Sequence, residues 1–99
     1  MSTLEAPSPA AGTAFAVDRS WRLSPQVALR DEAFGALAYH YGNRRLVFLK
    51  SRELVALVTS LEAYPSAAAA MDALVPERQR PHYERALSKL ATSEVIGVR

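Results

Sequence analysis

The sequence predicts an α+β domain of winged-helix type, in which a three-stranded antiparallel sheet is followed by three helices. Before Lys50, short alternating segments flank the hairpin-forming pair Gly42-Asn43. After Ser51, apolar residues recur at helical spacing, with breaks at Pro65 and Pro76. A chain of 99 residues has room for one hydrophobic core. We therefore expect a single domain.

Composition limits the classes of function. Twelve Lys and Arg residues against ten Asp and Glu give a formal charge of +2, which favours an acidic partner but falls short of the dense basic face of nucleic-acid-binding proteins. The sequence contains no cysteine, which excludes disulfides, thiolate catalysis and cysteine metal sites and fits a reducing compartment. It has no signal-peptide pattern and no apolar run near the ~20 residues of a membrane span. We expect an unanchored cytoplasmic protein.

The first part of the chain has the composition of a flexible tail. Residues 1–17 are rich in Ala, Pro, Ser, Thr and Gly without any period. The folded domain is predicted over residues 18–99, with Trp21 and Leu23 as the first large apolar side chains to pack.

The first strand is predicted over residues 25–30, because Val27 and Leu29 alternate with smaller or polar neighbours. Residues 31–35 are predicted to form the turn that follows. The neighbouring carboxyl groups of Asp31-Glu32 do not indicate an acid–base pair, because nothing fixes their separation or burial.

The second and third strands are predicted over residues 36–41 and 44–50, joined by a two-residue loop at Gly42-Asn43, where both residues tolerate positive φ. This loop places Tyr39 opposite Leu46, Leu37 opposite Phe48, Ala38 opposite Val47 and Ala36 opposite Leu49. Helices could pack closely on the face that carries the two alanines. The face with Tyr39 is the alternative, since a slip of one residue exchanges the faces.

Three helices are predicted to follow. Ser51 is a suitable N-cap for residues 52–62, and Ser66 for an Ala-rich helix over 67–74. Pro81 suits the first turn of a third helix that ends near residue 93. The apolar segment 95–98 is expected to form a short strand or an extended cap.

The third strand should lie at an edge of the sheet, because consecutive strands usually pair. An edge strand offers unpaired N–H and C=O groups, which natural proteins normally protect with charges or proline. The segment Leu46–Leu49 has neither within it. Its flanking charges are Arg44, Arg45 and Lys50. Either residues 95–98 cover this edge, or another peptide adds to it as a strand.

A guest strand needs more than backbone hydrogen bonds. Ordering seven or eight residues costs on the order of 10 kcal/mol, whereas each hydrogen bond returns about 1 kcal/mol net. Apolar guest side chains must therefore enter a groove, and the third helix is its natural second wall. The candidate peptide-binding residues are Arg45, Leu46, Val47, Phe48, Leu49 and Lys50 on the strand and Arg80, Tyr83, Arg85, Leu87, Lys89 and Leu90 on the helix. Together with Arg78, the helix cations would attract acidic residues.

A resemblance to a known family lies in two runs, WRLSPQVALRDEAFGALAYHYGNRRLVFLKSRELVALV and HYERALSKLATSEVI. They are similar to the PqqD-like precursor-peptide recognition domains, in particular the peptide chaperones of mycofactocin systems. The resemblance spans residues 18–96, and AYHYGNRRLVFLKS is its most specific portion. It implies that the leader of a ribosomally made precursor peptide binds along the third strand and against the third helix. It further implies delivery to a radical SAM enzyme, without chemistry or cofactor in the chaperone. In mycofactocin systems the precursor is short and acidic, and the enzyme decarboxylates and crosslinks its C-terminal Val-Tyr end.

Simpler interpretations remain open from the residues alone. Leu46–Leu49 could be covered internally, Tyr83, Leu87 and Leu90 could belong to the core, and the cations could form a solvated face. The main alternative function is DNA binding, since winged helices share this order of elements and a basic third helix. Against it, that helix carries few cations and the second helix, AAAAMDAL, offers no phosphate-binding group.

No feature of the sequence indicates an enzyme. His40 and His82 have no further ligands at metal-binding spacing, and no phosphate-binding glycine loop occurs. An exposed edge strand also permits weak pairing between two copies, so we expect a monomer or a weak homodimer.

Overall fold

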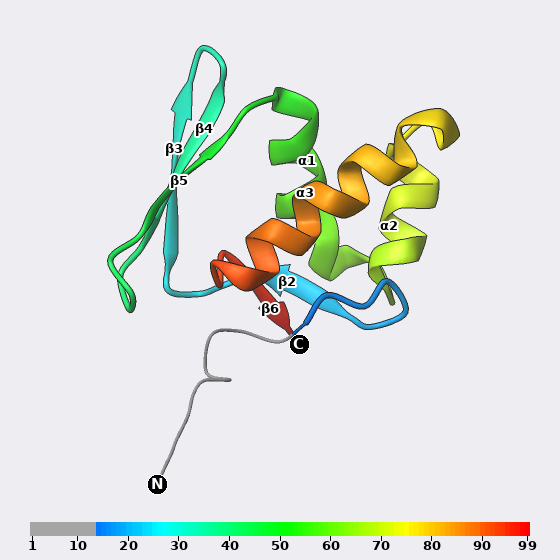
Figure 1. Ribbon diagram of the computed structural model, residues 1–99, viewed down its shortest axis with the longest axis horizontal. Coiled ribbons are helices and arrows are strands. Elements are labelled where there is room, and N and C mark those ends of the chain that lie inside the picture. The colour runs from blue at the N-terminus through cyan, green and yellow to red at the C-terminus, as the bar shows by residue number, and fades with distance from the viewer. Residues whose placement is uncertain (1–13) are drawn as a thin grey trace, which may run out of the picture.

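The computed structural model describes residues 14–99, which form two small sheets and three helices (Figure 1). Strands β3 (Val27–Glu32), β4 (Gly35–His40) and β5 (Leu46–Leu49) form a three-stranded antiparallel sheet, and β2 (Trp21–Leu23) pairs with β6 (Ile96–Val98). Helices α1 (Arg52–Ser60), α2 (Ala67–Leu74) and α3 (Arg80–Thr92) lie on one side of the larger sheet, with α2 farthest from it, and short 3₁₀ turns occur at Leu61–Ala63 and Glu77–Gln79. The predicted α+β class, with a three-stranded antiparallel sheet followed by three helices, is confirmed.

The domain packs from before Asp18. Most of the tail expected over residues 1–17 lies outside the described residues. Phe15 packs against Trp21 with ring centroids 5.1 Å apart and the rings tilted by 41°, and Val17 also packs against the core. The indole Nε1–H of Trp21 donates to the carbonyl of Ala16 at 2.8 Å. Packing thus begins at least by Phe15.

The register of β4 on β5 is the predicted one. Tyr39 lies opposite Leu46, and Ala38 lies opposite Val47. Of the two faces left open by the sequence, the alanine face is the buried one, with Ala36, Ala38 and Leu49 in the core. The small alanines let α1 approach the sheet closely, while Leu46 and Phe48 stay 58% and 55% exposed on the other face.

The predicted turn at residues 31–35 is too long. Strand β3 continues through Asp31, which pairs with Ala36, and Glu32, which pairs with Gly35, so only Ala33 and Phe34 form the turn. Gly35 has φ +150°, and a Cβ there would lie 2.2 Å from the carbonyl oxygen of Leu49. Backbone pairing with β4 therefore outweighed the turn-like composition of Asp31 and Glu32.

The predicted two-residue loop between β4 and β5 is too short, since residues 41–45 connect the two strands. Positive φ falls on Arg44 (64°) rather than on Gly42 or Asn43. His40 organises the loop instead, because its Nδ1 accepts from the N–H of Gly42 at 2.9 Å and of Asn43 at 3.1 Å. A Cβ on Gly42 would lie 2.8 Å from the His40 ring, so this position needs glycine for space.

Both predicted helix caps are confirmed. The Ser51 hydroxyl oxygen accepts from the N–H of Leu54 at 3.0 Å, and that of Ser66 accepts from Ala69 at 3.1 Å. The helices bury their apolar stripes against the sheet and each other. The largest fully buried side chains are Trp21, Leu49, Leu57, Val58, Leu61, Met71, Leu87, Val95 and Ile96.

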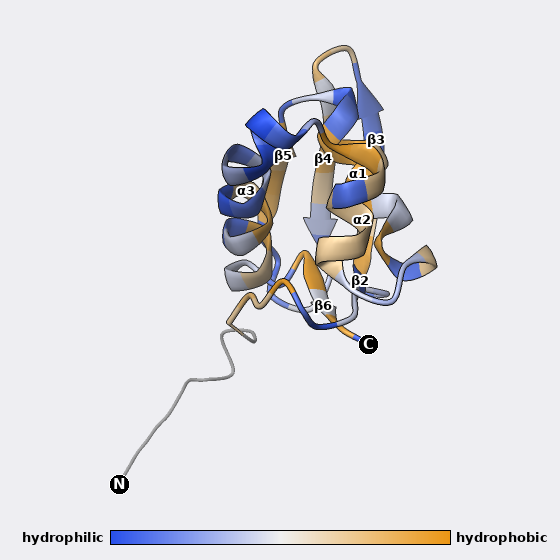
Figure 2. Cartoon of the chain, turned by 90° about the vertical axis from the view of Figure 1, so that its right-hand side faces the viewer, coloured by the Kyte–Doolittle hydropathy of each residue, from blue (hydrophilic) through white to orange (hydrophobic). Residues whose placement is uncertain are grey.

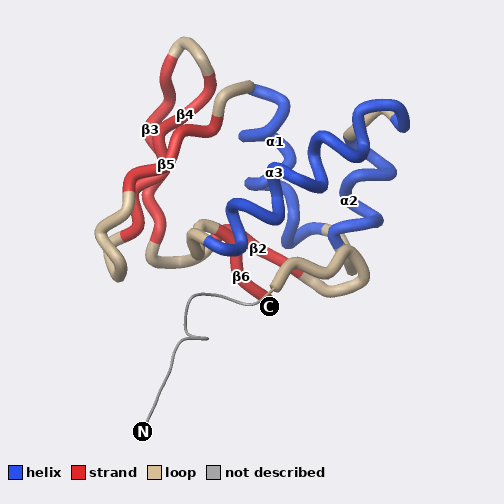
Figure 3. Tube along the Cα trace, viewed as in Figure 1, coloured by secondary structure: helices blue, strands red, loops and turns tan. Residues whose placement is uncertain are grey.

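Strand β2 was not predicted as a strand. It pairs antiparallel with β6, Trp21 opposite Val98 and Leu23 opposite Ile96. Figure 3 shows this small sheet beside the end of α3 and away from β5. The C-terminal segment thus forms the short strand that we expected as one option, but it does not cover the β5 edge.

Candidate functional site

The outer edge of β5 carries no partner strand among residues 14–99, where the sheet order is β3-β4-β5. The N–H of His40 donates to the carbonyl of Arg45 at 2.9 Å, which makes this a hydrogen-bonded pair of the ladder. Hydrogen-bonded and non-bonded pairs alternate along an antiparallel ladder. The backbone groups of Val47 and Leu49 therefore face β4, whereas the N–H and C=O of Leu46 and Phe48 point outward from the sheet.

A groove of about 360 Å³ lies between β5 and α3. Its lining residues are Val47, Phe48, Lys50, Leu54, His82, Arg85, Ala86, Lys89 and Leu90. Figure 2 shows the apolar strand β5 beside the largely hydrophilic helix α3. The groove thus joins the free backbone edge to an apolar floor and a polar wall.

The charges along this groove are all positive. Lys50, Arg85 and Lys89 line it, and no acidic side chain does. None of these three cations takes part in the ion pairs found among the described residues, which involve Arg30 and Arg80. The groove is therefore suited to a ligand that brings its own carboxylates.

The structure brings six of the predicted site residues together at the groove: Val47, Phe48, Lys50, Arg85, Lys89 and Leu90. Arg45 and Leu46 are exposed on the same edge but lie outside the groove lining. Leu49, Tyr83 and Leu87 are buried in the core, so they support the walls from behind.

Arg80, the remaining predicted residue, has partners of its own. Its Nη1 pairs with a carboxylate oxygen of Asp72, and its Nε lies 3.5 Å from Oε2 of Glu84. This cation joins the start of α3 to α2 and does not line the groove. Arg78 is exposed in the 3₁₀ turn before α3 and also lies outside the lining.

Sequence reasoning missed three lining residues, Leu54, His82 and Ala86. Leu54 belongs to the apolar stripe of α1, and spacing alone did not show that this helix would bring it to the groove beside β5. The other two follow from helical spacing, since 82, 85, 86 and 89 share one face of an α-helix. That periodicity could have identified Ala86 as the small residue that leaves room in the groove.

The two walls of the groove are linked at one end by Asn43. Its side-chain Nδ2 donates to the carbonyl of Ser93 at 3.1 Å and lies 3.3 Å from Oε1 of Glu94. Its Oδ1 accepts from the N–H of Arg45 at 2.9 Å. One side chain thus fixes the β4–β5 hairpin against the end of α3, and so holds β5 at its distance from that helix.

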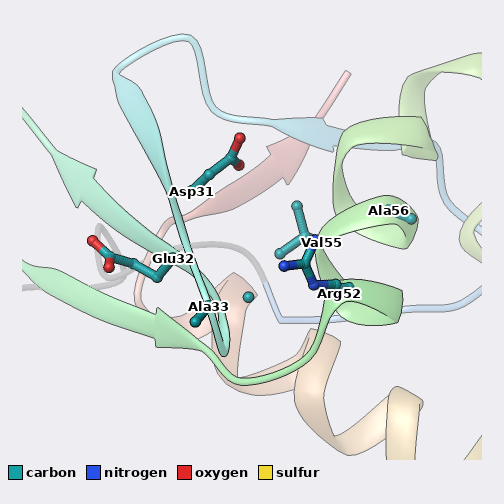
Figure 4. Close-up of a pocket in the computed structure, with 7 residues that line it drawn as sticks. Asp31, Glu32, Ala33, Arg52, Val55 and Ala56 are labelled. Atoms are coloured by element: carbon teal, nitrogen blue, oxygen red, sulfur yellow. The ribbon is translucent and has the colours of Figure 1, made fainter.

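A second hollow, of about 470 Å³, lies between the β3–β4 hairpin and α1. Asp31, Glu32 and Arg52 contribute to its lining, but Figure 4 shows the two carboxylates pointing away from each other. Among residues 14–99 no cluster of three His, Cys, Asp or Glu side chains is placed to hold a metal ion. Over the same range, no helix has the length and apolar content that crossing a membrane requires.

Comparisons with known proteins identify the family of the chain. The sequence model of the peptide chaperone MftB family matches residues 20–97, nearly all of the described domain. The chain belongs to the MftB family. A protein of Mycobacterium ulcerans named peptide chaperone MftB is 46% identical over 97 residues, covering 95% of this chain and 89% of its own length.

Two further MftB proteins show the same level of similarity. The Mycobacterium tuberculosis protein is 48% identical over 83% of this chain and 76% of its own length. The Mycolicibacterium smegmatis protein is 47% identical over 83% of this chain and 81% of its own length. Both are named peptide chaperone MftB. No solved structure shows a significant match to the chain.

Proposed function

We propose that this protein is a peptide chaperone that binds the leader of a ribosomally made precursor, the mycofactocin precursor peptide, and delivers it to a radical SAM maturase. The leader adds as a strand to the outer edge of β5 and packs against α3. The observation that carries this proposal is the unpaired edge at Leu46 and Phe48, which borders the groove between β5 and α3. Membership of the MftB family, whose named members are peptide chaperones, supports it.

Binding of a peptide requires both the free backbone edge of β5 and the groove between β5 and α3. Two outward residues offer two N–H and two C=O groups, each worth about 1 kcal/mol net, against an ordering cost of about 1 to 2 kcal/mol for every guest residue. Hydrogen bonds alone cannot hold the guest. Burial of each apolar guest side chain adds roughly 1.5 to 3 kcal/mol, and the floor of Val47, Leu54 and Leu90 provides the apolar surface for it.

The positive charges along the groove favour an acidic peptide. Lys50, Arg85 and Lys89 stand along the groove without an acidic neighbour in its lining. An acidic peptide would be drawn toward this surface, and its carboxylates would compensate the cations as they lose water. This fits the short acidic precursor of mycofactocin systems.

The chemistry belongs to the partner enzyme in this proposal. The chain binds and presents the peptide in the cytoplasm and leaves its mass unchanged, and a cofactor is not required. The MftB relatives are named chaperones, which points the same way.

A groove-filling substitution tests the proposal. The synthetic precursor peptide is titrated calorimetrically into the wild-type chain and into Ala86→Glu, which places a bulky anion in the groove. We expect Ala86→Glu to weaken binding by about 10- to 100-fold, the equivalent of losing one buried guest side chain. Ala73→Glu is the matched control, because Ala73 is an exposed helical alanine of α2 that does not line the groove.

Equal affinities for the wild type and Ala86→Glu would refute binding in this groove.

The same preparation is also titrated with duplex DNA at several salt concentrations. A DNA-binding protein would lose roughly one log unit of affinity per log unit of salt for each phosphate contacted. Tight DNA binding with such a slope, and no binding of the precursor, would replace the proposal by the winged-helix DNA-binding alternative.

A further inference from the structure

The outer face of the larger sheet carries an exposed aromatic pair next to the groove. Phe34, in the β3–β4 turn, and Phe48, on β5, are 44% and 55% exposed. Their rings meet edge to face, with centroids 5.8 Å apart and an interplanar angle of 89°. Turns of this kind usually carry Gly, Asn or Asp, so an exposed phenylalanine there has no local conformational reason.

The backbone holds this pair in place. Gly35 brings the β3–β4 turn so close to the end of β5 that a Cβ at residue 35 would clash with the Leu49 carbonyl. That approach sets Phe34 beside Phe48. The edge-to-face contact then fixes the orientation of the Phe48 ring.

An opening of about 310 Å³ lies between Phe34, Phe48 and Lys50. Its size is at the lower end of ligand pockets, which suits a single side chain better than a whole small molecule. Phe48 and Lys50 also line the groove between β5 and α3. The opening and the groove therefore share two lining residues at the free edge of β5.

We propose that Phe34, Phe48 and Lys50 form a second subsite that takes an apolar side chain of the bound peptide on the outer face of the sheet. This inference rests on the proposed strand addition to β5. In a β-ladder, a guest residue opposite Phe48 projects its side chain to the same face as Phe48, with Cβ atoms about 5 Å apart. This holds for either direction of the guest strand, because the faces alternate along every strand.

The two subsites impose a pattern on the peptide. The guest residue opposite Phe48 enters the outer subsite, and the residues on either side of it point toward the groove. The recognised segment therefore carries consecutive apolar residues rather than the alternating pattern of an ordinary edge strand. The stem of Lys50 packs along the apolar guest while its ammonium group stays free to meet a neighbouring carboxylate.

A library of random short peptides displayed on mRNA tests this pattern. It is selected on the immobilised full-length chain and on its variants Phe34→Ala, Leu74→Ala and Ala86→Glu. Leu74 is the matched control, since it is an apolar residue of α2 with the same exposure as Phe34, 44%, and lies outside both subsites. We expect the wild type and Leu74→Ala to enrich a block of adjacent apolar residues.

With Phe34→Ala, we expect the central position of that block to lose its apolar preference while the flanking positions keep theirs. A peptide selected on the wild type should bind Phe34→Ala about tenfold more weakly, comparable to the loss of one aromatic contact. An unchanged pattern and affinity would overturn the second subsite while leaving strand addition intact. The sedimentation coefficients of the wild type and Phe34→Ala are compared as well. A difference between them without a change in the selected pattern would also overturn the second subsite and assign the aromatic pair to a contact between copies. Enrichment that persists on Ala86→Glu would instead contradict the groove of the proposed function.

Discussion

At the scale of single residues, His40 and Asn43 shape the hairpin that presents the β5 edge. The His40 ring is buried and its Nδ1 accepts two backbone N–H groups, so the proton of the neutral ring lies on Nε2. Asn43 uses its side chain to join the hairpin to the end of α3. The sequence drew attention to Asn43 for its backbone freedom, but its function in the fold comes from the amide group.

The role of His40 Nδ1 as an acceptor can be tested by His40→Phe, which keeps a ring and removes both hydrogen bonds. Leaving two loop N–H groups without their acceptor should lower the free energy of unfolding by about 1 to 3 kcal/mol, measured by urea denaturation. His82→Phe is the control, because His82 is the other histidine of the chain and is exposed. If the two variants unfold at the same urea concentration, the His40 ring does not organise the loop.

At the scale of the elements, the sequence predicted what depends on local chemistry. The Ser51 and Ser66 caps and the register of β4 on β5 follow from residue types and spacing that act over a few positions. Strand β2 could not be found in this way. It spans three residues, too few to show a period, and its partner β6 lies more than 70 residues later in the chain, so only the tertiary fold creates it.

The candidate site was predictable to a similar extent. The free edge and the groove were deduced from strand order and helix position, and Val47, Arg85, Lys89 and Leu90 lie where they were expected. Leu87 was not separable from Leu90 by sequence, because residues three apart share a helix face. Both are buried in the core, and only Leu90 also lines the groove. The outer aromatic pair was missed because Phe34 and Phe48 meet only when the β3–β4 turn folds onto β5.

The alternation of backbone groups along β5 leads to an element-scale prediction. Phe48→Pro removes an N–H that faces outward, and proline is tolerated at such edge positions. We expect the variant to keep its thermal stability to within a few degrees and to bind the precursor at least about tenfold more weakly than Phe48→Ala, which removes only the ring. Calorimetric titration and thermal unfolding of both variants provide the measurement.

Val47→Pro is the comparison variant for Phe48→Pro, because the N–H of Val47 in the wild type faces β4. Losing that hydrogen bond should destabilise the sheet itself by about 1 to 3 kcal/mol. The assigned alternation is wrong if Val47→Pro is as stable as the wild type while Phe48→Pro unfolds.

At the scale of the whole molecule, the fold leaves the β5 edge of the larger sheet without a partner strand among residues 14–99. The C-terminal segment pairs with β2 beside the end of α3, so it completes the core without covering the edge of β5. The Asn43 contact joins the groove walls at one end, and at the other end β5 leads directly into α1 through the Ser51 cap. A groove held in this way loses little conformational entropy when the peptide binds. The main entropic cost of binding is therefore the ordering of the peptide.

Amide hydrogen exchange of the β5 backbone, followed by NMR with and without the synthetic precursor peptide, tests the central claim most directly. We predict that the free protein protects the amides of Val47 and Leu49 and exchanges those of Leu46 and Phe48 rapidly. Addition of the peptide should protect Leu46 and Phe48 by at least about tenfold, as expected for newly formed ladder hydrogen bonds. Leu46 and Phe48 amides that are already protected in the free protein, or that remain unprotected when the peptide is bound, would contradict strand addition at this edge.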